Sequence, residues 1–137
     1  MQVLLTVKSR FSAAHRLLNP DWDDAKNYEV FGSCYNPNGH GHDYSVEVTV
    51  EGPVSSETGM ILNLKQLKDV VEEEVIRHVD HKHLNHDVPF LEGLNPTAEN
   101  LAQVFWRRLE AKIPAGRLYE VRIFETENNI ATVRGND

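Results

Sequence analysis

Apolar and polar residues alternate along two segments in the first part of the chain. Between residues 3 and 15 one parity is apolar and the other polar, apart from Leu4: Val3, Leu5, Val7, Phe11 and Ala13 against Gln2, Thr6, Lys8, Arg10 and Ser12. Residues 42–51 alternate more regularly, and their apolar parity consists of Tyr44, Val46, Val48 and Val50. Because side chains two apart in a strand share a face, this period predicts two half-buried strands.

The segment between these strands has an irregular composition. Asn19-Pro20, followed by Asp21 and Asp23, predicts a short helix that ends near Gly32. A connection of this length in a small domain is more often functional than not.

Residues further along the chain change to a helical period. After a turn at residues 57–59, Asn63 is a suitable N-cap with Gln66 at the third helical position, and one face is apolar: Leu64, Leu67, Val71 and Val75. A second helix is expected to begin at residues 95–97 with Thr97 as its N-cap and to end before Pro114 and Gly116; its inward face is Leu101, Val104, Phe105 and Leu109.

The last part of the chain returns to alternation. Residues 117–126 have the strand period, and the pair Asn128-Asn129 predicts a turn into a last strand at residues 130–134. The resulting order is strand, strand, helix, helix, strand, strand. It predicts an α+β fold, in which an antiparallel sheet carries both helices on one face.

Composition limits the class of protein and its partners. The 137 residues, of which 40% are hydrophobic and 26% charged, suggest one globular domain that spans residues 1–137. No apolar run approaches the ~18 residues of a membrane span, and the first residues do not resemble a signal peptide. A single cysteine excludes an intramolecular disulfide and fits a reducing cytosol, so we expect a cytoplasmic protein. The net charge of −7 argues against nucleic acid or an anionic membrane as the main partner.

Three histidines lie on matching apolar parities. His40 and His42 share the parity of Tyr44, and His15 ends the apolar parity of the first strand. If the two strands pair antiparallel, the three imidazoles converge on one patch. Neutral imidazoles in this arrangement suit Zn²⁺ with an open fourth position, as in a catalytic site. A His-x-His pair alone in a glycine-rich loop is usually only a loop, so His15 is the residue that favours a metal.

Cys34 allows three interpretations. It can be a small buried apolar residue. Beside a metal ion its thiol pKa would fall, and the thiolate could then act as a base. Its sulfur could also be a fourth ligand, which would close the site into a structural one. The residues alone leave these alternatives open.

Two further features carry ionisable groups. Asp80 and His81, after the first long helix, offer a carboxylate–imidazole pair for proton transfer. Other histidines cluster near the same helix C-terminus, where cations are mildly favoured, so a structural role is the stronger interpretation here. Glu125 shares the parity of Val121 and Ile123, which places a carboxylate on the buried face. It therefore needs a partner, either Arg or Lys, or a ligand with paired N–H donors such as a pterin edge.

Five segments together resemble the 6-pyruvoyl-tetrahydropterin synthase family. They are "FSAAHRL", "CYNPNGHGHDY", "DHKHLN", "NPTAEN" and "FETENN", in the family's order and over nearly the whole chain. The resemblance implies that three histidines bind zinc: His15, His40 and His42. It further implies that Cys34 is a general base rather than a ligand and that Asp80 and His81 assist proton transfer.

The same resemblance implies a substrate and a reaction. The substrate would be 7,8-dihydroneopterin triphosphate, with Glu125 anchoring the pterin ring and further contacts near Thr97. Ala98 departs from the second threonine of animal members, which affects those contacts. Triphosphate leaves, and internal redox isomerisation gives 6-pyruvoyl-tetrahydropterin; zinc is sufficient because no electrons leave the substrate. Lys8, Arg10 and Arg16 are candidates for binding the triphosphate.

Two alternatives to this function remain at this point. Five residues separate Cys34 from His40, which resembles the pyruvoyl branch, whereas 6-carboxytetrahydropterin synthases of queuosine and deazapurine biosynthesis more often have three. That second enzyme, which uses the same substrate, is the first alternative. A non-catalytic zinc- or pterin-binding module is the alternative from another class.

The resemblance also implies a tunnelling fold and an assembly. Four-stranded sheets from three chains would close into a barrel, and two barrels would stack into a homo-hexamer. The physics agrees, because closure removes the open edges of a four-stranded sheet. Active sites in the family lie between subunits, and the sequence leaves open whether Asp80 and His81 serve their own chain or a neighbour.

Overall fold

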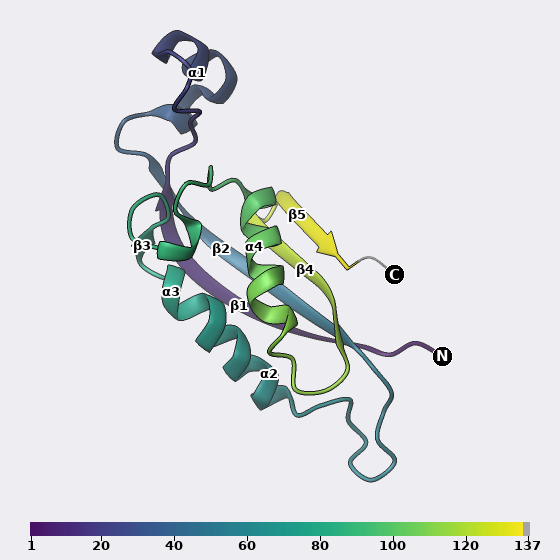
Figure 1. Cartoon of the computed structure of the whole chain (residues 1–137). Coiled ribbons are helices and arrows are strands. Elements are labelled where there is room, and N and C mark those ends of the chain that lie inside the picture. The colour runs from purple at the N-terminus through teal and green to yellow at the C-terminus, as the bar shows by residue number, and fades with distance from the viewer. Residues whose placement is uncertain (136–137) are drawn as a thin grey trace.

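The computed structural model describes residues 1–135 and has the expected α+β fold (Figure 1). In chain order its elements are β1 (Leu4–His15), α1 (Asp24–Phe31), the 3₁₀ turn η1 (Gly32–Tyr35), β2 (His40–Glu51), α2 (Leu64–Val71), the π-helical turn η2 (Glu72–Ile76), α3 (Arg77–Val79), β3 (Lys82–His83), the 3₁₀ turn η3 (Pro89–Leu91), α4 (Ala98–Glu110), β4 (Arg117–Thr126) and β5 (Asn129–Arg134). No helix in this described part is long and apolar enough to cross a membrane.

The four predicted strands form an antiparallel sheet. Together with β3 its order is β3-β1-β2-β4-β5. The addition, β3, is two residues long and pairs in parallel with Ala13 and Ala14 of β1. A two-residue strand has no periodicity, so the sequence could not predict it. The last hairpin turns one residue earlier than expected, because Thr126 already pairs with Asn129.

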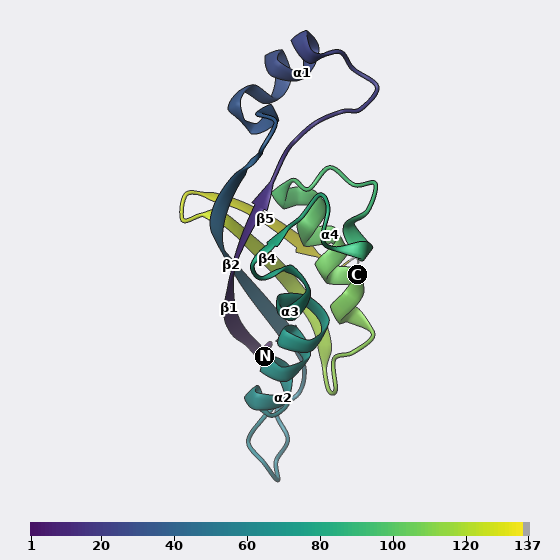
Figure 2. The ribbon, with the colours of Figure 1, turned by 90° about the vertical axis from the view of Figure 1, so that its left-hand side faces the viewer.

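The helices α2, α3 and α4 cover one face of the sheet, as predicted (Figure 2). In α2 the side chain of Asn63 accepts a hydrogen bond from the Lys65 amide at 2.9 Å, so the predicted cap is present. The predicted short helix is α1, which begins after its cap Asp23 and ends at Gly32. It projects beyond the end of the sheet, away from the other helices (Figures 1 and 2).

The core lies between the helices and the sheet. Tyr44, Val46, Val48 and Val50 of β2 are completely buried there, and so are Leu67, Val71 and Val75 of the helical layer. Leu64, which was predicted on the same helix face, is 45% exposed instead. Periodicity gives the face of a helical residue but not where along the helix the covered region begins, and Leu64 occupies the first helical position.

A bulge changes the parity of β4. The pairing of β2 with β4 shifts register between Thr49 and Val50. As a result Leu118 and Val121 are both buried although they are three positions apart and would lie on opposite faces of a regular strand. The parity that carries Ile123 and Glu125 therefore begins at Val121 and not at the start of the strand.

Candidate metal centre and active site

The pairing of β1 with β2 brings the three histidines together. His15 lies directly opposite His40, and His42 is opposite Ala13, two residues along the same face. The ring centroids are 4.9 Å apart for His15 and His40, 5.1 Å for His15 and His42, and 4.7 Å for His40 and His42. The rings are nearly perpendicular to one another, with interplanar angles of 76°, 84° and 88°. The predicted convergence of the imidazoles is therefore present.

The nitrogens of this cluster suit a metal ion. One ligand atom from each histidine lies within 4.8 Å of the other two. Nδ1 of His15 is 2.8 Å from the Pro96 carbonyl oxygen, which can only accept, so Nδ1 carries the proton and Nε2 has a free lone pair. Nε2 of His15 and Nε2 of His42 are buried without a hydrogen-bond partner. Buried unpartnered nitrogens are costly, and a metal ion would satisfy them.

Burial favours the neutral imidazoles of His15 and His42. It lowers the pKa of His15, and the neighbouring His40 and His42 lower it further against the opposing influences of the Pro96 carbonyl and Glu125. Burial likewise lowers the pKa of His42. Because a metal binds the neutral imidazole, this environment favours the ligand form near neutral pH.

Glu125 points at the histidine cluster from β4. Its Oε1 is 3.3 Å from Nε2 of His42, outside hydrogen-bond geometry, and its side chain is 22% exposed. Within residues 1–135 no Arg or Lys forms an ion pair with it, so the internal salt bridge that the sequence allowed is not formed in this part. The carboxylate is left beside the metal-ligand group, where a ligand could reach it.

Tyr44 completes the inner wall of the cluster. Its hydroxyl is 3.3 Å from Nδ1 of His15, and the residue is completely buried. Burial, with the charge of Glu125, raises the pKa of the phenol, so Tyr44 remains a neutral hydrogen-bonding group.

Cys34 interacts electrostatically with Glu125 and Tyr44 beside the cluster but does not belong to the group that could hold the ion. It lies in η1, two residues after the α1 C-cap Gly32, whose φ of 57° favours glycine. The residue is half-buried. Burial raises the pKa of its thiol, and the negative charge of Glu125 adds to this, so a nearby cation would be needed to make a thiolate.

Asp80 and His81 lie elsewhere, at the β1 edge of the sheet. Oδ1 of Asp80 accepts a hydrogen bond from the Ser12 amide at 2.9 Å, and Oδ2 is 3.1 Å from Nδ1 of His81. The Ser12 amide lowers the pKa of the carboxyl, with His81 as a smaller cause. The side chain of His81 is 82% exposed, and its backbone has a φ of 60°, unusual for a residue other than glycine.

His81 lies on the outward side of the sheet. It lines a shallow depression of about 510 Å³ together with Ser12 and Asp43, which belong to the outward parity of β1 and β2. His42 also lines this depression, although it belongs with His15 and His40 to the inward parity of the same strands. The exposed imidazole of His81 is therefore not part of the three-histidine group of its own chain, although the depression that it lines extends to His42.

Thr97 has the capping role that the sequence predicted. Its hydroxyl accepts a hydrogen bond from the Asn100 amide at 3.1 Å, and the side chain of Asn100 donates to the Asn95 carbonyl oxygen at 2.8 Å. The preceding residue is Pro96, whose carbonyl orients His15. The start of α4 is thus joined to the metal centre, although the sequence pointed to Thr97 and not to the Pro96 carbonyl.

Asn85 is a further residue that the sequence analysis missed. Its side-chain oxygen accepts from the Arg16 amide at 2.8 Å, and its side-chain nitrogen donates to the Arg16 carbonyl oxygen at 2.8 Å. It therefore pairs with the chain after His15 as a neighbouring strand would. Its place in the "DHKHLN" segment is the signal that could have identified it.

The three cations considered for the triphosphate do not lie together. Lys8 and Arg10 belong to the outward parity of β1. Nζ of Lys8 is 5.4 Å from the ring centroid of Phe124. The guanidinium of Arg16 follows the metal ligand His15 and lies 4.2 Å from the ring centroid of Tyr35.

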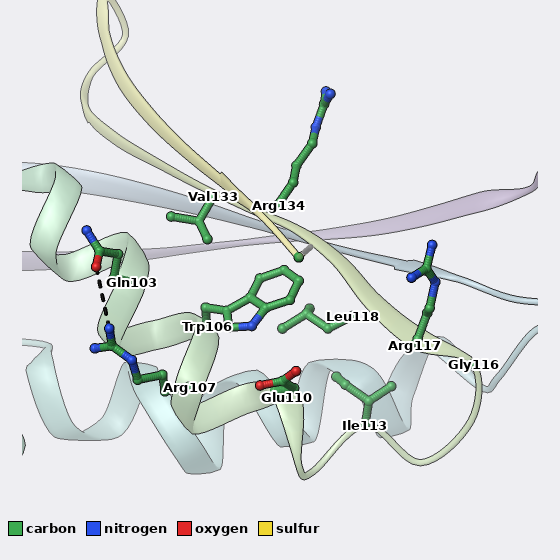
Figure 3. A pocket seen from close by; sticks show the side chains of 11 residues that line it. Gln103, Trp106, Arg107, Glu110, Ile113, Gly116, Arg117, Leu118, Val133 and Arg134 are labelled. Atoms are coloured by element: carbon green, nitrogen blue, oxygen red, sulfur yellow. Dashed lines mark hydrogen bonds between the residues drawn. The ribbon is translucent and has the colours of Figure 1, made fainter. Parts of the chain in front are cut away.

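A cavity of about 550 Å³ is located away from all these groups. It lies between α4 and the ends of β4 and β5, where Trp106, Leu118 and Val133 line it (Figure 3). None of the predicted site residues contributes to its walls. Volume therefore does not identify the functional site of this protein.

Comparison with known proteins shows the family of this chain. The family model described as 6-pyruvoyl tetrahydropterin synthase matches residues 4–136. The chain is 43% identical over 134 residues to 6-pyruvoyl tetrahydrobiopterin synthase of Homo sapiens, covering 98% of this chain and 92% of that protein. It is 48% identical over 133 residues to the Drosophila melanogaster protein of the same name, covering 96% and 79%. The solved structure of Caenorhabditis elegans 6-pyruvoyl tetrahydropterin synthase superimposes with a TM-score of 0.93 at 39% identity, covering 99% of this chain and 97% of that one. The chain belongs to the 6-pyruvoyl tetrahydropterin synthase family.

Proposed function

We propose that the protein is a zinc-dependent lyase that converts 7,8-dihydroneopterin triphosphate into 6-pyruvoyl-tetrahydropterin and triphosphate. The observation that carries this proposal is the cluster of three histidines, two of which have buried and unpartnered Nε2 atoms, with a cysteine that lies outside the ligand group. The relatives of this chain that are named 6-pyruvoyl tetrahydrobiopterin synthase, and that match it over 96–98% of its length, support the same reaction. The reaction is balanced without another reactant, since the atoms of the substrate are divided between the two products and its electrons stay within the pterin.

His15, His40 and His42 would hold the ion. Three nitrogen ligands with a fourth position open to substrate are the usual catalytic arrangement of zinc. When bound, zinc supplies a Lewis acid that polarises the side-chain oxygens of the substrate and makes the adjacent C–H bonds more acidic. The Pro96 carbonyl keeps the proton of His15 on Nδ1, so that Nε2 remains available as the ligand atom.

Cys34 is the proposed general base. Its position outside the three-histidine group supports this role over that of a fourth ligand. Without a cation, burial and Glu125 keep its thiol protonated. A positive charge in the histidine cluster would lower that pKa, so thiolate formation would depend on the loaded site.

Asp80 and His81 are proposed to act in a neighbouring subunit. His81 is highly exposed and lines a depression with Ser12 and Asp43 of the outward parity, and neither Asp80 nor His81 belongs to the three-histidine group of its own chain. The carboxylate fixes the imidazole through Nδ1, which leaves Nε2 to exchange a proton with a substrate bound next to another chain's metal centre. The sheet has open edges that favour such an assembly: β5 forms one edge, and β3 covers just two residues of β1 at the other. We infer closure into trimeric barrels that pair into a hexamer.

Glu125 is proposed to bind the pterin. No Arg or Lys in the described residues pairs with it, and a carboxylate can accept two N–H groups from a 2-amino-4-oxo ring edge. Thr97 would contribute to the same pocket from the start of α4, although its hydroxyl already serves the helix cap.

The product assay tests the function. Zinc-loaded protein is incubated with 7,8-dihydroneopterin triphosphate, and triphosphate release and the pterin product are followed early in the reaction by mass spectrometry. We expect triphosphate and 6-pyruvoyl-tetrahydropterin in equal amounts. Formation of 6-carboxytetrahydropterin would instead place the protein in the other branch. Absence of triphosphate release would indicate a binding module.

A further inference from the structure

We propose that Arg16 is a positioning residue: its side chain holds the turn that carries Cys34 in register with the metal ligand His15 and does not bind the triphosphate. This inference rests on the proposed function, because it assigns the guanidinium to the catalytic cysteine instead of the substrate. It also excludes one of the three cations that the sequence offered for the phosphate groups.

The guanidinium of Arg16 is directed at a single residue, the one after Cys34. Its Nε donates to the Tyr35 carbonyl oxygen at 2.8 Å. Its central carbon lies 4.2 Å from the centroid of the Tyr35 ring. A guanidinium that binds phosphate presents its planar fork to the ligand, whereas here both the face and Nε contact Tyr35.

The backbone around Arg16 connects the same turn to the metal centre. The Leu17 amide donates to the Cys34 carbonyl oxygen at 2.9 Å. Two consecutive carbonyl groups, those of Cys34 and Tyr35, are therefore bound to the two residues that follow His15. Arg16 itself is fixed on the other side, because both of its backbone polar groups bond to Asn85.

Tyr35 is held firmly enough to transmit this restraint. It is 7% exposed, and its hydroxyl donates to Asp24 at 2.5 Å. Its ring also meets that of Tyr28 edge to face, with centroids 4.8 Å apart. Asp24 and Tyr28 belong to α1, so the turn is bound between α1 and the end of β1.

These contacts connect the proposed base Cys34 to the proposed metal ligand His15 through a few hydrogen bonds. Cys34 is six residues before His40, and the intervening loop includes a turn at residues 37–38 next to Gly39 that would otherwise permit movement. With the guanidinium removed, one backbone hydrogen bond from Leu17 remains to hold the turn against β1. A displacement of the base of about 1 Å can cost ~100-fold in rate without changing substrate affinity.

Lysine at this position separates the two possible roles. Lysine would restore a positive charge for the triphosphate. It has no planar guanidinium, however, so it can neither donate from Nε nor stack a flat face on an aromatic ring. If Arg16 positions Cys34, Arg16→Lys should behave as Arg16→Ala does. If Arg16 binds phosphate, lysine should restore much of the lost affinity.

The experiment compares Arg16→Ala, Arg16→Lys and Tyr35→Leu with the wild type in the full-length, zinc-loaded protein. The control Arg107→Ala removes an exposed arginine whose side chain bonds to Gln103 at 3.4 Å. Two measurements are made: kcat and KM for triphosphate release, and amide hydrogen exchange of residues 32–36 without substrate. Thermal midpoints and zinc content show whether each variant folds and retains metal. Both Arg16 variants keep the backbone bonds to Asn85, and Arg16→Lys also keeps a long aliphatic side chain, so it should fold even if Arg16→Ala does not.

We expect both Arg16 variants to lose roughly 10- to 100-fold in kcat with KM unchanged, and exchange to become faster at residues 32–36. Tyr35→Leu should change both quantities in the same direction, although it removes no charge, and Arg107→Ala should change neither. A raised KM that lysine restores, unchanged exchange in the Arg16 variants, or loss of zinc from them would each overturn the proposal. Absence of triphosphate release in the wild type would refute the proposed function alone, and the exchange comparison would still decide the role of Arg16.

Discussion

The carbonyl oxygen of Pro96 accepts a hydrogen bond from Nδ1 of His15 at 2.8 Å, although the two residues are 81 positions apart in sequence. This bond fixes both the tautomer and the orientation of the candidate metal ligand His15 from the residue before the N-cap of α4. The candidate metal centre is therefore built by three parts of the fold: the end of β1, the start of β2 and the residues just before α4.

The first prediction concerns the ligand set. His15→Ala removes one of three nitrogen ligands, so zinc content should fall from about one ion per chain, as a three-histidine site requires, to nearly none. Zinc is measured by atomic spectrometry after purification. His86→Ala is the matched control, since it removes a histidine that stacks on His83 and should leave zinc in place. Full retention of zinc by His15→Ala would contradict the assignment.

The variant Cys34→Ala tests whether the Cys34 thiol is a general base or a metal ligand. If Cys34 is the base, the variant should lose about 10²- to 10⁴-fold in kcat and keep its zinc. Both quantities are measured on the same preparation. Simultaneous loss of zinc would make the sulfur a ligand, and unchanged activity would remove Cys34 from the mechanism.

Gly39→Ala should weaken metal binding. Gly39 has a φ of 69°, and a Cβ there would overlap the backbone carbonyl of His15. The loop before His40 must then move, and disturbed support of a ligand typically costs about 10- to 100-fold in metal affinity. Zinc competition with a chromophoric chelator measures this loss. Gly93→Ala is the control: its φ is 79°, but an added Cβ meets nothing within 4 Å. Equal zinc affinities in the two variants would show that backbone strain alone, without the clash, explains any effect.

The proposed contribution of His81 to the site of a neighbouring chain predicts complementation between inactive subunits. Cys34→Ala and His81→Ala should each be inactive alone. Mixed assemblies should regain activity, because a site with the cysteine of one chain and the histidine of another is intact. Subunits are unfolded together, refolded and assayed, with native mass spectrometry to show that mixing occurred. Mixed assemblies without activity would place Asp80 and His81 at the metal of their own chain.

Acid should destabilise the metal-free protein through its buried imidazoles. The folded-state pKa values of His15 and His42 lie below the ordinary value of 6.5. Between those lowered values and 6.5 the unfolded chain binds more protons than the folded one, so stability is present above 6.5 and decreases as pH falls. Urea unfolding of chelator-treated protein at constant concentration measures this slope. His42→Gln should reduce the slope, and a free energy of unfolding that stays constant between neutral pH and pH 5 would contradict the prediction.

The sequence predicted the fold and the convergence of the three histidines for a common physical reason. A period of two assigns faces along β1 and β2, and an antiparallel pairing then places His15 beside His40 without further information. The predicted caps at Asn63 and Thr97 are present because capping depends on a few adjacent residues.

Features that depend on distant parts of the chain could not be predicted in this way. The bulge opposite Val50 changes parity within β4, and the exposure of Leu64 depends on where the helical layer ends. The contacts of the Pro96 carbonyl and of Asn85 join segments far apart in sequence, which local patterns do not report. The side of the sheet on which Asp80 and His81 emerge follows from the path of the chain after α3.

The exposure of His81 outside the three-histidine group of its own chain has a consequence for mixtures of damaged and intact chains. Under the proposed assembly every subunit contributes to two reaction centres, one through Cys34 and the other through His81. A chain that has lost both groups would then silence its own centre and one belonging to a healthy companion. The activity of such a mixture would fall more steeply than the fraction of intact chains. A single faulty allele would then behave as partly dominant.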